Sequence, residues 1–145
     1  MIKRFPGRIR PGHVYVGRSR LHGRGVFARR AFSPGEVVER CPVVIVPAAQ
    51  LGALQATDLY SYSYQWSRDC ALAQGYGGLY NHSYTPNAHF EIKTQRGLVN
   101  IIAIEDITDD EEITINYNGD PMDQSPLWFE PVALRETECP KETWP

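Results

Sequence analysis

The apolar segments of this chain are short, and glycine, proline and aspartate interrupt them at close intervals. The longest ones, residues 42–49 and 98–104, stop far below the roughly 20 apolar residues that a membrane-spanning helix needs. No internal repeat is visible, and 145 residues suffice for one hydrophobic core but not for two large ones. The sequence therefore predicts a single, mainly β domain of several short curved sheets with few short helices.

The strongest local signal lies at residues 59–66, where aromatic and small polar side chains alternate strictly. Tyr60, Tyr62, Tyr64 and Trp66 fall on one side, which predicts a strand with an aromatic face. Turn residues and local composition indicate the remaining elements. These are strands at residues 14–16, 25–28, 36–39, 42–47, 88–93, 98–104 and 112–117, a short helix within 47–56, a helical turn at 69–74 and a hairpin turn at 94–97.

The net charge of −2 conceals an uneven distribution of charge along the chain. Residues 1–30 hold nine of the fifteen lysines and arginines and no acid, whereas the remainder holds six bases and seventeen acids. Both parts are compatible with ordinary solvated surface. Alternatively, the acidic body attracts a basic polypeptide, and the basic flank contacts nucleic acid or an acidic partner.

The three cysteines, Cys41, Cys70 and Cys139, are odd in number and far apart, which favours reduced thiols over disulfides or a zinc cluster. The basic residues at the N-terminus are not followed by an apolar stretch, as they would be in a secretory signal. We therefore expect a cytoplasmic or nuclear location.

Three polar blocks interrupt the predicted strands. Gly23-Arg24-Gly25 is compatible with a plain hairpin turn, or with close approach of a ligand to the backbone. Asn81 and His82 open a second block that ends at Pro86-Asn87, and such residues also serve as turn formers. Tyr117 ends the last predicted strand, where a tyrosine is usually a core aromatic with a solvated hydroxyl.

In this order and spacing, the three blocks resemble the SET domain family of protein-lysine methyltransferases, over residues 14–118. The resemblance implies short sheets stacked around a threaded, knot-like C-terminal segment. It divides the chain into a basic irregular arm (1–12), a SET domain (13–118) and a closing segment (119–145). The small size and the lack of cysteine clusters resemble stand-alone bacterial or viral members.

The family implies the ligands of the site. It predicts S-adenosylmethionine as cofactor and S-adenosylhomocysteine as product. In SET domains the Gly-x-Gly turn lies against the methionine part of the cofactor, Asn81 would bind its amino-acid end, and His82 would contact the adenine side. The residues expected to bind the cofactor are therefore Gly23, Arg24, Gly25, Asn81, His82, Tyr117 and Trp128.

The family also implies an aromatic channel for the substrate lysine. Tyr117 would point its hydroxyl at the transferring methyl group, and Tyr62 would form the opposite wall, so both are the expected catalytic residues. Phe90 and Ile115 occupy positions where a tyrosine limits the number of methyl groups in some members, and their lack of a hydroxyl favours multiple methylation. The expected channel residues are Tyr62, Phe90, Ile115 and Phe129.

Known members often close this channel with a cysteine zinc knot, whereas this chain has only Cys139 in that region. Because a zinc site needs four ligands, we expect no metal. Trp128 and Phe129 would close the site instead, by stacking on adenine and completing the channel. They could equally form a plain hydrophobic clip onto the sheet.

The sequence thus predicts an S-adenosylmethionine-dependent protein-lysine N-methyltransferase. Its expected substrate is a lysine in a basic segment of a histone, histone-like, ribosomal or translation protein. Two alternatives remain open, which are a catalytically weak SET domain that only binds lysine tails, and a small β-rich nucleic-acid-binding protein. The basic arm could contact nucleic acid in either case.

Overall fold

Two small sheets form the body of this protein in the computed structural model, which describes residues 12–127. The first is a four-stranded sheet in the order β1-β2-β9-β6. Its outer half is an antiparallel hairpin in which Tyr15 pairs with Phe27, and β2 then pairs with β9. The strands are β1 (Val14–Arg18), β2 (Arg24–Ala28), β6 (Asn81–His82) and β9 (Glu112–Ile115).

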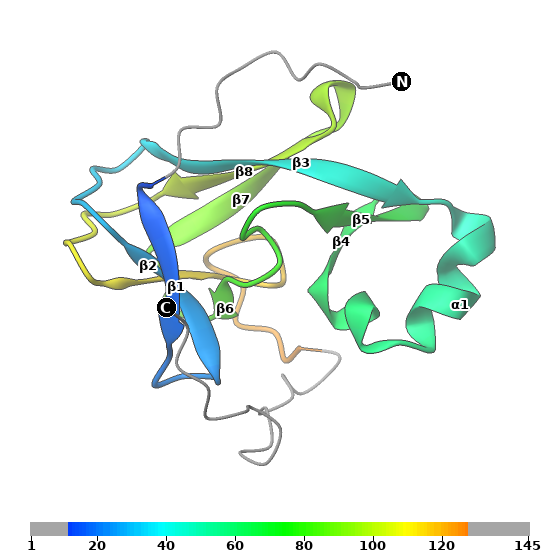
Figure 1. Ribbon diagram of the computed structural model, residues 1–145, viewed down its shortest axis with the longest axis horizontal. Helices are drawn as coiled ribbons and strands as arrows, with labels where there is room; N and C mark the ends of the chain where they lie inside the picture. Colours follow the sequence, from blue (N-terminus) through cyan, green and yellow to red (C-terminus); the bar gives the residue numbers. More distant parts are fainter. Residues whose placement is uncertain (1–11, 128–145) are drawn as a thin grey trace.

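The second sheet has five strands in the order β4-β5-β3-β8-β7, all antiparallel. Figure 1 shows the long strand β3 bridging the molecule, with the helical turns at one end and the β1–β2 hairpin at the other. The strands are β3 (Val37–Val46), β4 (Ser63–Trp66), β5 (Asp69–Ala73), β7 (Ala88–Lys93) and β8 (Leu98–Ala103). The helical elements are η1 (Ala48–Gln50), α1 (Leu51–Gln55), η2 (Asp58–Tyr62) and η3 (Thr94–Arg96).

One hydrophobic core unites the two sheets. Val26 and Ile113 from the first sheet and Val99 and Ile101 from the second are fully buried in the same cluster. These side chains occupy alternate positions on their strands, as the period of two requires. None of the helices in the described residues is long and apolar enough to cross a membrane.

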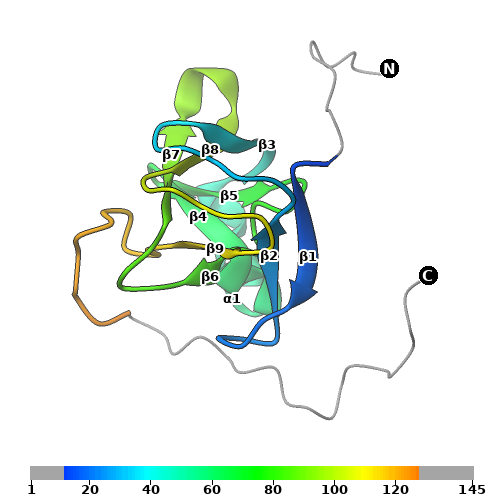
Figure 2. The same ribbon diagram turned by 90° about the vertical axis from the view of Figure 1, so that its left-hand side faces the viewer.

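The parallel pairing of β6 with β9 is the contact that assembles the polar blocks. Asn81 lies opposite Thr114, and His82 lies opposite Ile115. Figure 2 shows β6 and β9 side by side near the centre of the molecule. The pairing places the Asn-His block directly beside the strand that leads to Tyr117.

Most of the predicted elements are confirmed. The strands β1, β2, β7, β8 and β9 form, and α1 lies within the expected helical segment. Between β7 and β8, Gly97 adopts φ 61°, which a residue with a side chain rarely takes. The chain also turns at Asp109-Asp110, before β9, with Asp110 at φ 63°.

Two local predictions were wrong. Residues 69–74 were expected to form a helical turn, but Asp69–Ala73 form β5, because this segment fills the gap between β3 and β4. The helix propensity of its alanines and leucine is overridden by strand pairing on both sides. The strand predicted for residues 59–66 begins only at Ser63, and Tyr60 and Tyr62 lie in η2.

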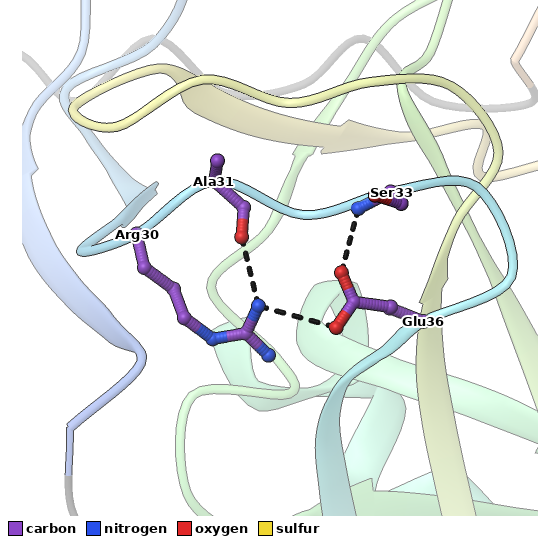
Figure 3. A network of polar contacts seen from close by, with 4 residues as sticks. All are labelled: Arg30, Ala31, Ser33 and Glu36. Carbon is purple, nitrogen blue, oxygen red and sulfur yellow. Dashed lines mark hydrogen bonds and ion pairs between the residues drawn. The ribbon is translucent and has the colours of Figure 1, made fainter.

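A polar network fixes the turn that leads into β3 (Figure 3). The Arg30 guanidinium donates to the Ala31 carbonyl at 2.8 Å and to Glu36 at 3.2 Å, and the Ser33 N–H donates to the same carboxylate at 2.6 Å. The amide and guanidinium hydrogen bonds lower the pKa of Glu36. Phe32, within this turn, is buried and pairs with Ile107, which anchors the entry to the second sheet.

Candidate active site

Asn81 lies at the centre of the first polar cluster. Its Nδ2 donates to the carbonyls of His22 (3.3 Å) and Arg24 (3.0 Å) and to Glu112 Oε1 (2.7 Å). Three oxygen acceptors around one atom identify it as the amide nitrogen. No donor among residues 12–127 binds Oδ1 of this side chain, so this acceptor is available to a ligand.

Glu112 joins the Asn-His strand to the turn between β1 and β2. Its second oxygen accepts a hydrogen bond of 2.8 Å from Ser19 Oγ, which in turn accepts the N–H groups of Leu21 and His22. A Cβ at Gly25 would overlap the Glu112 carboxylate and lie 2.9 Å from Asn81 Nδ2. Only glycine therefore allows this close approach, which the sequence alone left open.

His82 is held as a neutral imidazole. Its Nδ1 accepts the backbone N–H of Tyr117 at 3.1 Å, so the ring proton resides on Nε2. This Nε2 is buried and has no hydrogen-bond partner among the described residues. Burial lowers the pKa of His82, which favours the neutral form. A buried donor without a hydrogen-bond partner lowers the stability of the fold. A ligand that accepts a hydrogen bond from Nε2–H would remove that cost.

Tyr117 connects this cluster to a cavity. Its ring centroid lies 5.2 Å from that of His82, and its hydroxyl donates to the Tyr80 carbonyl at 2.7 Å. Burial, with smaller contributions from Tyr62 and Glu112, raises its pKa to about 12. The hydroxyl is therefore protonated at neutral pH and acts as a donor.

The cavity has a volume of about 500 Å³ and is lined by several aromatic rings together with polar side chains that include Arg68 and Asp69. The ring of Phe90 packs edge-on against Tyr64, with centroids 4.9 Å apart. Tyr64 is fixed by a 2.6 Å hydrogen bond from its hydroxyl to the Gly77 carbonyl. Of the expected channel residues, Tyr62, Phe90 and Ile115 line this cavity, and the expected catalytic residue Tyr117 lines it too. The fourth expected channel residue, Phe129, lies outside the described residues.

Asn87 ties the end of the second block to β9. Its Nδ2 donates to the Glu112 carbonyl at 2.8 Å and to Glu111 at 3.2 Å, and its Oδ1 accepts the Thr114 N–H at 2.9 Å. Glu111 itself accepts hydrogen bonds from the Thr108 backbone and side chain. Both glutamates are thus occupied by structural contacts.

The predicted site residues fall into two adjacent groups. One group surrounds the β1–β2 turn and β6, and it contains Gly23, Arg24, Gly25, Asn81 and His82. The other lines the cavity, and Tyr117 belongs to both. Trp128 and Phe129 lie outside the described residues, so their roles stay predictions. Among the described residues no group of three potential metal ligands occurs.

Sequence reasoning missed several residues that shape this site. Ser19 was not singled out, although it orders the turn beside Asn81. Tyr64 was assigned to packing, although it lines the cavity. Tyr80 is buried and donates to Glu39 at 2.6 Å, so its carbonyl is held where the Tyr117 hydroxyl binds. Of these residues, only Tyr64 had a signal in the sequence, which was its place in the alternating series with Tyr62 and Trp66.

Comparisons with known proteins agree with this arrangement. A family model described as SET domain matches residues 23–118. A crystal structure described as that of a "Plasmodium falciparum putative histone methyltransferase" is similar at 32% identity and a TM-score of 0.59, over 72% of this chain and 92% of that chain. None of the curated proteins matches this chain.

A second similar structure is a humanized mutant of the Chaetomium thermophilum Polycomb Repressive Complex 2, bound to the inhibitor GSK126. The identity is 19% and the TM-score 0.61, over 72% of this chain and 14% of that chain. At this identity the similarity shows a shared fold alone.

Proposed function

The chain belongs to the SET domain family, and from this premise we propose that it is an S-adenosylmethionine-dependent protein-lysine N-methyltransferase. The family and the similarity to the Plasmodium structure support a methyltransferase. The lysine acceptor, the methyl donor and the residues assigned to them are the finer part of the proposal, and the geometry around Tyr117 supports them.

The observation that carries the proposal is the double position of Tyr117. Its backbone N–H binds His82 in the group proposed to hold the cofactor, and its side chain lines the aromatic cavity. A methyl donor on one side and an amine on the other would therefore meet at its hydroxyl. Because that hydroxyl is fixed to the Tyr80 carbonyl, the meeting point is preorganised.

The residues of the first group fit S-adenosylmethionine in donor and acceptor type. Asn81 Oδ1 would accept a hydrogen bond from the cofactor's ammonium group, and the backbone of residues 23–25 would lie along the methionine part of the cofactor. The Nε2–H group of His82 would donate a hydrogen bond to the cofactor. When bound, the cofactor supplies a methyl group on a positively charged sulfur. The protein's own task is to place an uncharged amine in line with that group.

The cavity walls favour the uncharged amine. A free lysine has a pKa of about 10.4, so at pH 7 the neutral form costs about 4.6 kcal/mol to reach. Desolvation by Tyr62, Tyr64 and Phe90 lowers the pKa of an entering ammonium. Cation–π attraction to the same rings favours the charged form and opposes this effect. We propose that desolvation prevails at the inner end, beside Tyr117.

The charge of the protein supports a basic polypeptide as substrate. Residues 31–127 hold thirteen acids and four bases, so this part of the surface attracts basic segments. Histones, histone-like proteins, ribosomal proteins and translation factors share that character. An unstructured basic segment would present a lysine long enough to reach the inner end of the cavity.

Two experiments test this function. Calorimetry with S-adenosylhomocysteine should show one site, whereas a β-rich nucleic-acid binder would show none. Incubation with isotope-labelled methyl donor and mixed basic proteins, followed by mass spectrometry, should show a mass increase on lysine. Binding of the cofactor product without any transfer to a panel of histones, ribosomal proteins and translation factors would favour the lysine-tail binding module instead.

A further inference from the structure

The tip of the β1–β2 hairpin carries an arginine cluster whose side chains have no role in the proposed methyl transfer, in which Arg24 takes part through its backbone. Arg18, Arg20 and Arg24 are all exposed on it, with the half-buried His22 between them. No ion pair within residues 12–127 involves any of these three arginines. The Glu112 carboxylate, which is hydrogen-bonded to this tip, binds Ser19 and Asn81 instead.

The register of the hairpin brings two of these positive charges together, which destabilises the strand pair. Arg18 lies directly opposite Arg24, on the same face of the two strands. Like charges in directly opposed positions destabilise a strand pair. Because no ion pair within residues 12–127 offsets this repulsion, the arrangement is suited to an external anion that neutralises both guanidinium groups.

The tip is also rigid. The Ser19 N–H donates to the Gly23 carbonyl at 3.0 Å, and Ser19 Oγ accepts the N–H groups of Leu21 at 2.9 Å and His22 at 3.2 Å. The same hydroxyl donates to Glu112 in β9, the strand that pairs with β2 in this sheet. A partner that binds here would therefore not have to order the backbone of the turn first.

We propose that this arginine hairpin tip, residues 18–24, binds the phosphate backbone of double-stranded DNA. Residues 12–30 contain five arginines and no lysine. The planar guanidinium group of arginine matches the geometry of a phosphate better than the ammonium group of lysine does. A two-stranded β-ribbon fits the major groove of B-DNA, which is about 12 Å wide. The major groove of duplex RNA is too narrow for side chains to enter, so DNA is favoured over RNA.

Within the described residues, the charge of residues 31–127 favours contact at this hairpin. Residues 31–127 carry a net charge of −9, which repels a polyanion. Figures 1 and 2 show the β1–β2 connection (blue) at the lower edge of the described part, at the opposite end of the molecule from α1 in Figure 1. DNA bound there would leave the acidic surface free for a basic polypeptide.

Fluorescence anisotropy with a labelled DNA duplex tests the proposal on the full chain. The double variant Arg18→Gln/Arg20→Gln should bind about tenfold more weakly, and the slope of log K against log salt, between about 50 and 200 mM, should fall by about 2. The matched control, Arg40→Gln/Arg96→Gln, makes the same charge change at exposed arginines of β3 and η3 and should bind within about twofold of the unmodified protein.

Three results would overturn the proposal. The first is equal loss of DNA binding in both double variants. The second is binding of duplex RNA, a polyglutamate peptide or phosphatidylserine vesicles that is as tight as binding of the duplex DNA. The third is no binding of DNA by the unmodified protein even at low salt. Thermal unfolding checks that both variants fold, and Arg18→Lys/Arg20→Lys, which keeps the charge, should retain most of the salt slope.

Discussion

The backbone N–H of Tyr117 donates a hydrogen bond of 3.1 Å to Nδ1 of His82. This bond links β6 to the second residue after β9, 35 positions along the chain, and it fixes which ring nitrogen of His82 carries the proton. The orientation of the imidazole and the position of the tyrosine are therefore set together. A change at either residue should affect both the proposed cofactor side and the cavity.

The link between His82 and Tyr117 predicts a pH-dependent stability. Burial lowers the pKa of His82 in the folded protein, so the unfolded chain binds more protons between the folded pKa and the ordinary value of about 6.5. The free energy of unfolding should therefore be highest above pH 6.5 and fall as the pH drops through that window. Protonation of Nδ1 would also remove the acceptor of the Tyr117 N–H.

Urea unfolding at several pH values measures this effect. His82→Asn keeps an acceptor near the Nδ1 position but does not titrate, so the loss of stability toward acid pH should be smaller in this variant. An equally steep loss in the variant would assign the effect to other groups. His89→Asn, in β7, serves as a control for general loss of a histidine.

Gly25 should tolerate no side chain, whereas Gly52 should. A Cβ at Gly25 would overlap the Glu112 carboxylate, so Gly25→Ala should destabilise the protein by about 1–3 kcal/mol and weaken cofactor binding. Gly52 lies within α1 with nothing near its Cβ position, so Gly52→Ala should stabilise by about 0.5–1 kcal/mol. Denaturant unfolding measures both, and equal stability of the two variants would contradict the close approach at Gly25.

Tyr80 is expected to support the cavity through Glu39. Its buried hydroxyl donates to Glu39 Oε2 at 2.6 Å, and the Tyr76 N–H donates to the other oxygen at 2.9 Å. Tyr80→Phe should therefore lower the free energy of unfolding by about 1.5–3 kcal/mol. Tyr15→Phe is the control, because the hydrogen bond from Tyr15 to Asp110 is exposed and its loss should cost less. A smaller loss at position 80 than at position 15 would contradict this account.

Phe90 offers a test of the cavity's volume. Its ring lines the cavity beside Tyr64, and the added hydroxyl of Phe90→Tyr would occupy space and bind water there. We expect the unmodified protein to add more than one methyl group to a lysine, and the variant to stop earlier. Mass spectrometry of the product measures the distribution. An unchanged distribution would place the limit on methylation elsewhere.

Local sequence patterns predicted most of the strands but not how they meet. The turns at Gly97 and Asp110 follow from residues that accept a positive φ, and the strand at Ser63–Trp66 follows from alternation. By contrast, alternation gave the wrong prediction for η2, and helical composition gave the wrong prediction for β5, which pairs with β3 more than 20 residues earlier in the chain. The parallel pairing of β6 with β9 joins segments more than 30 residues apart, which no local signal specifies.

The same distinction applies to the site. The motifs indicated Asn81, His82 and Tyr117 because their family resemblance is specific, and the structure brings the three together. Ser19 and Tyr80 were not identified because both depend on partners far along the chain, Glu112 for Ser19 and Glu39 and Tyr117 for Tyr80. Such partners become visible only when the chain is folded.

Tyr117→Phe tests the central claim most directly. The variant keeps the ring that lines the cavity and the backbone bond to His82, and it loses only the hydroxyl held by the Tyr80 carbonyl. Single-turnover methyl transfer to a lysine substrate identified by mass spectrometry, with calorimetry of S-adenosylhomocysteine binding in parallel, measures the effect. The account predicts a loss of at least about 100-fold in rate, as expected for a positioned hydroxyl donor, with binding of the cofactor product changed only a few fold. A rate near that of the unmodified protein would contradict it.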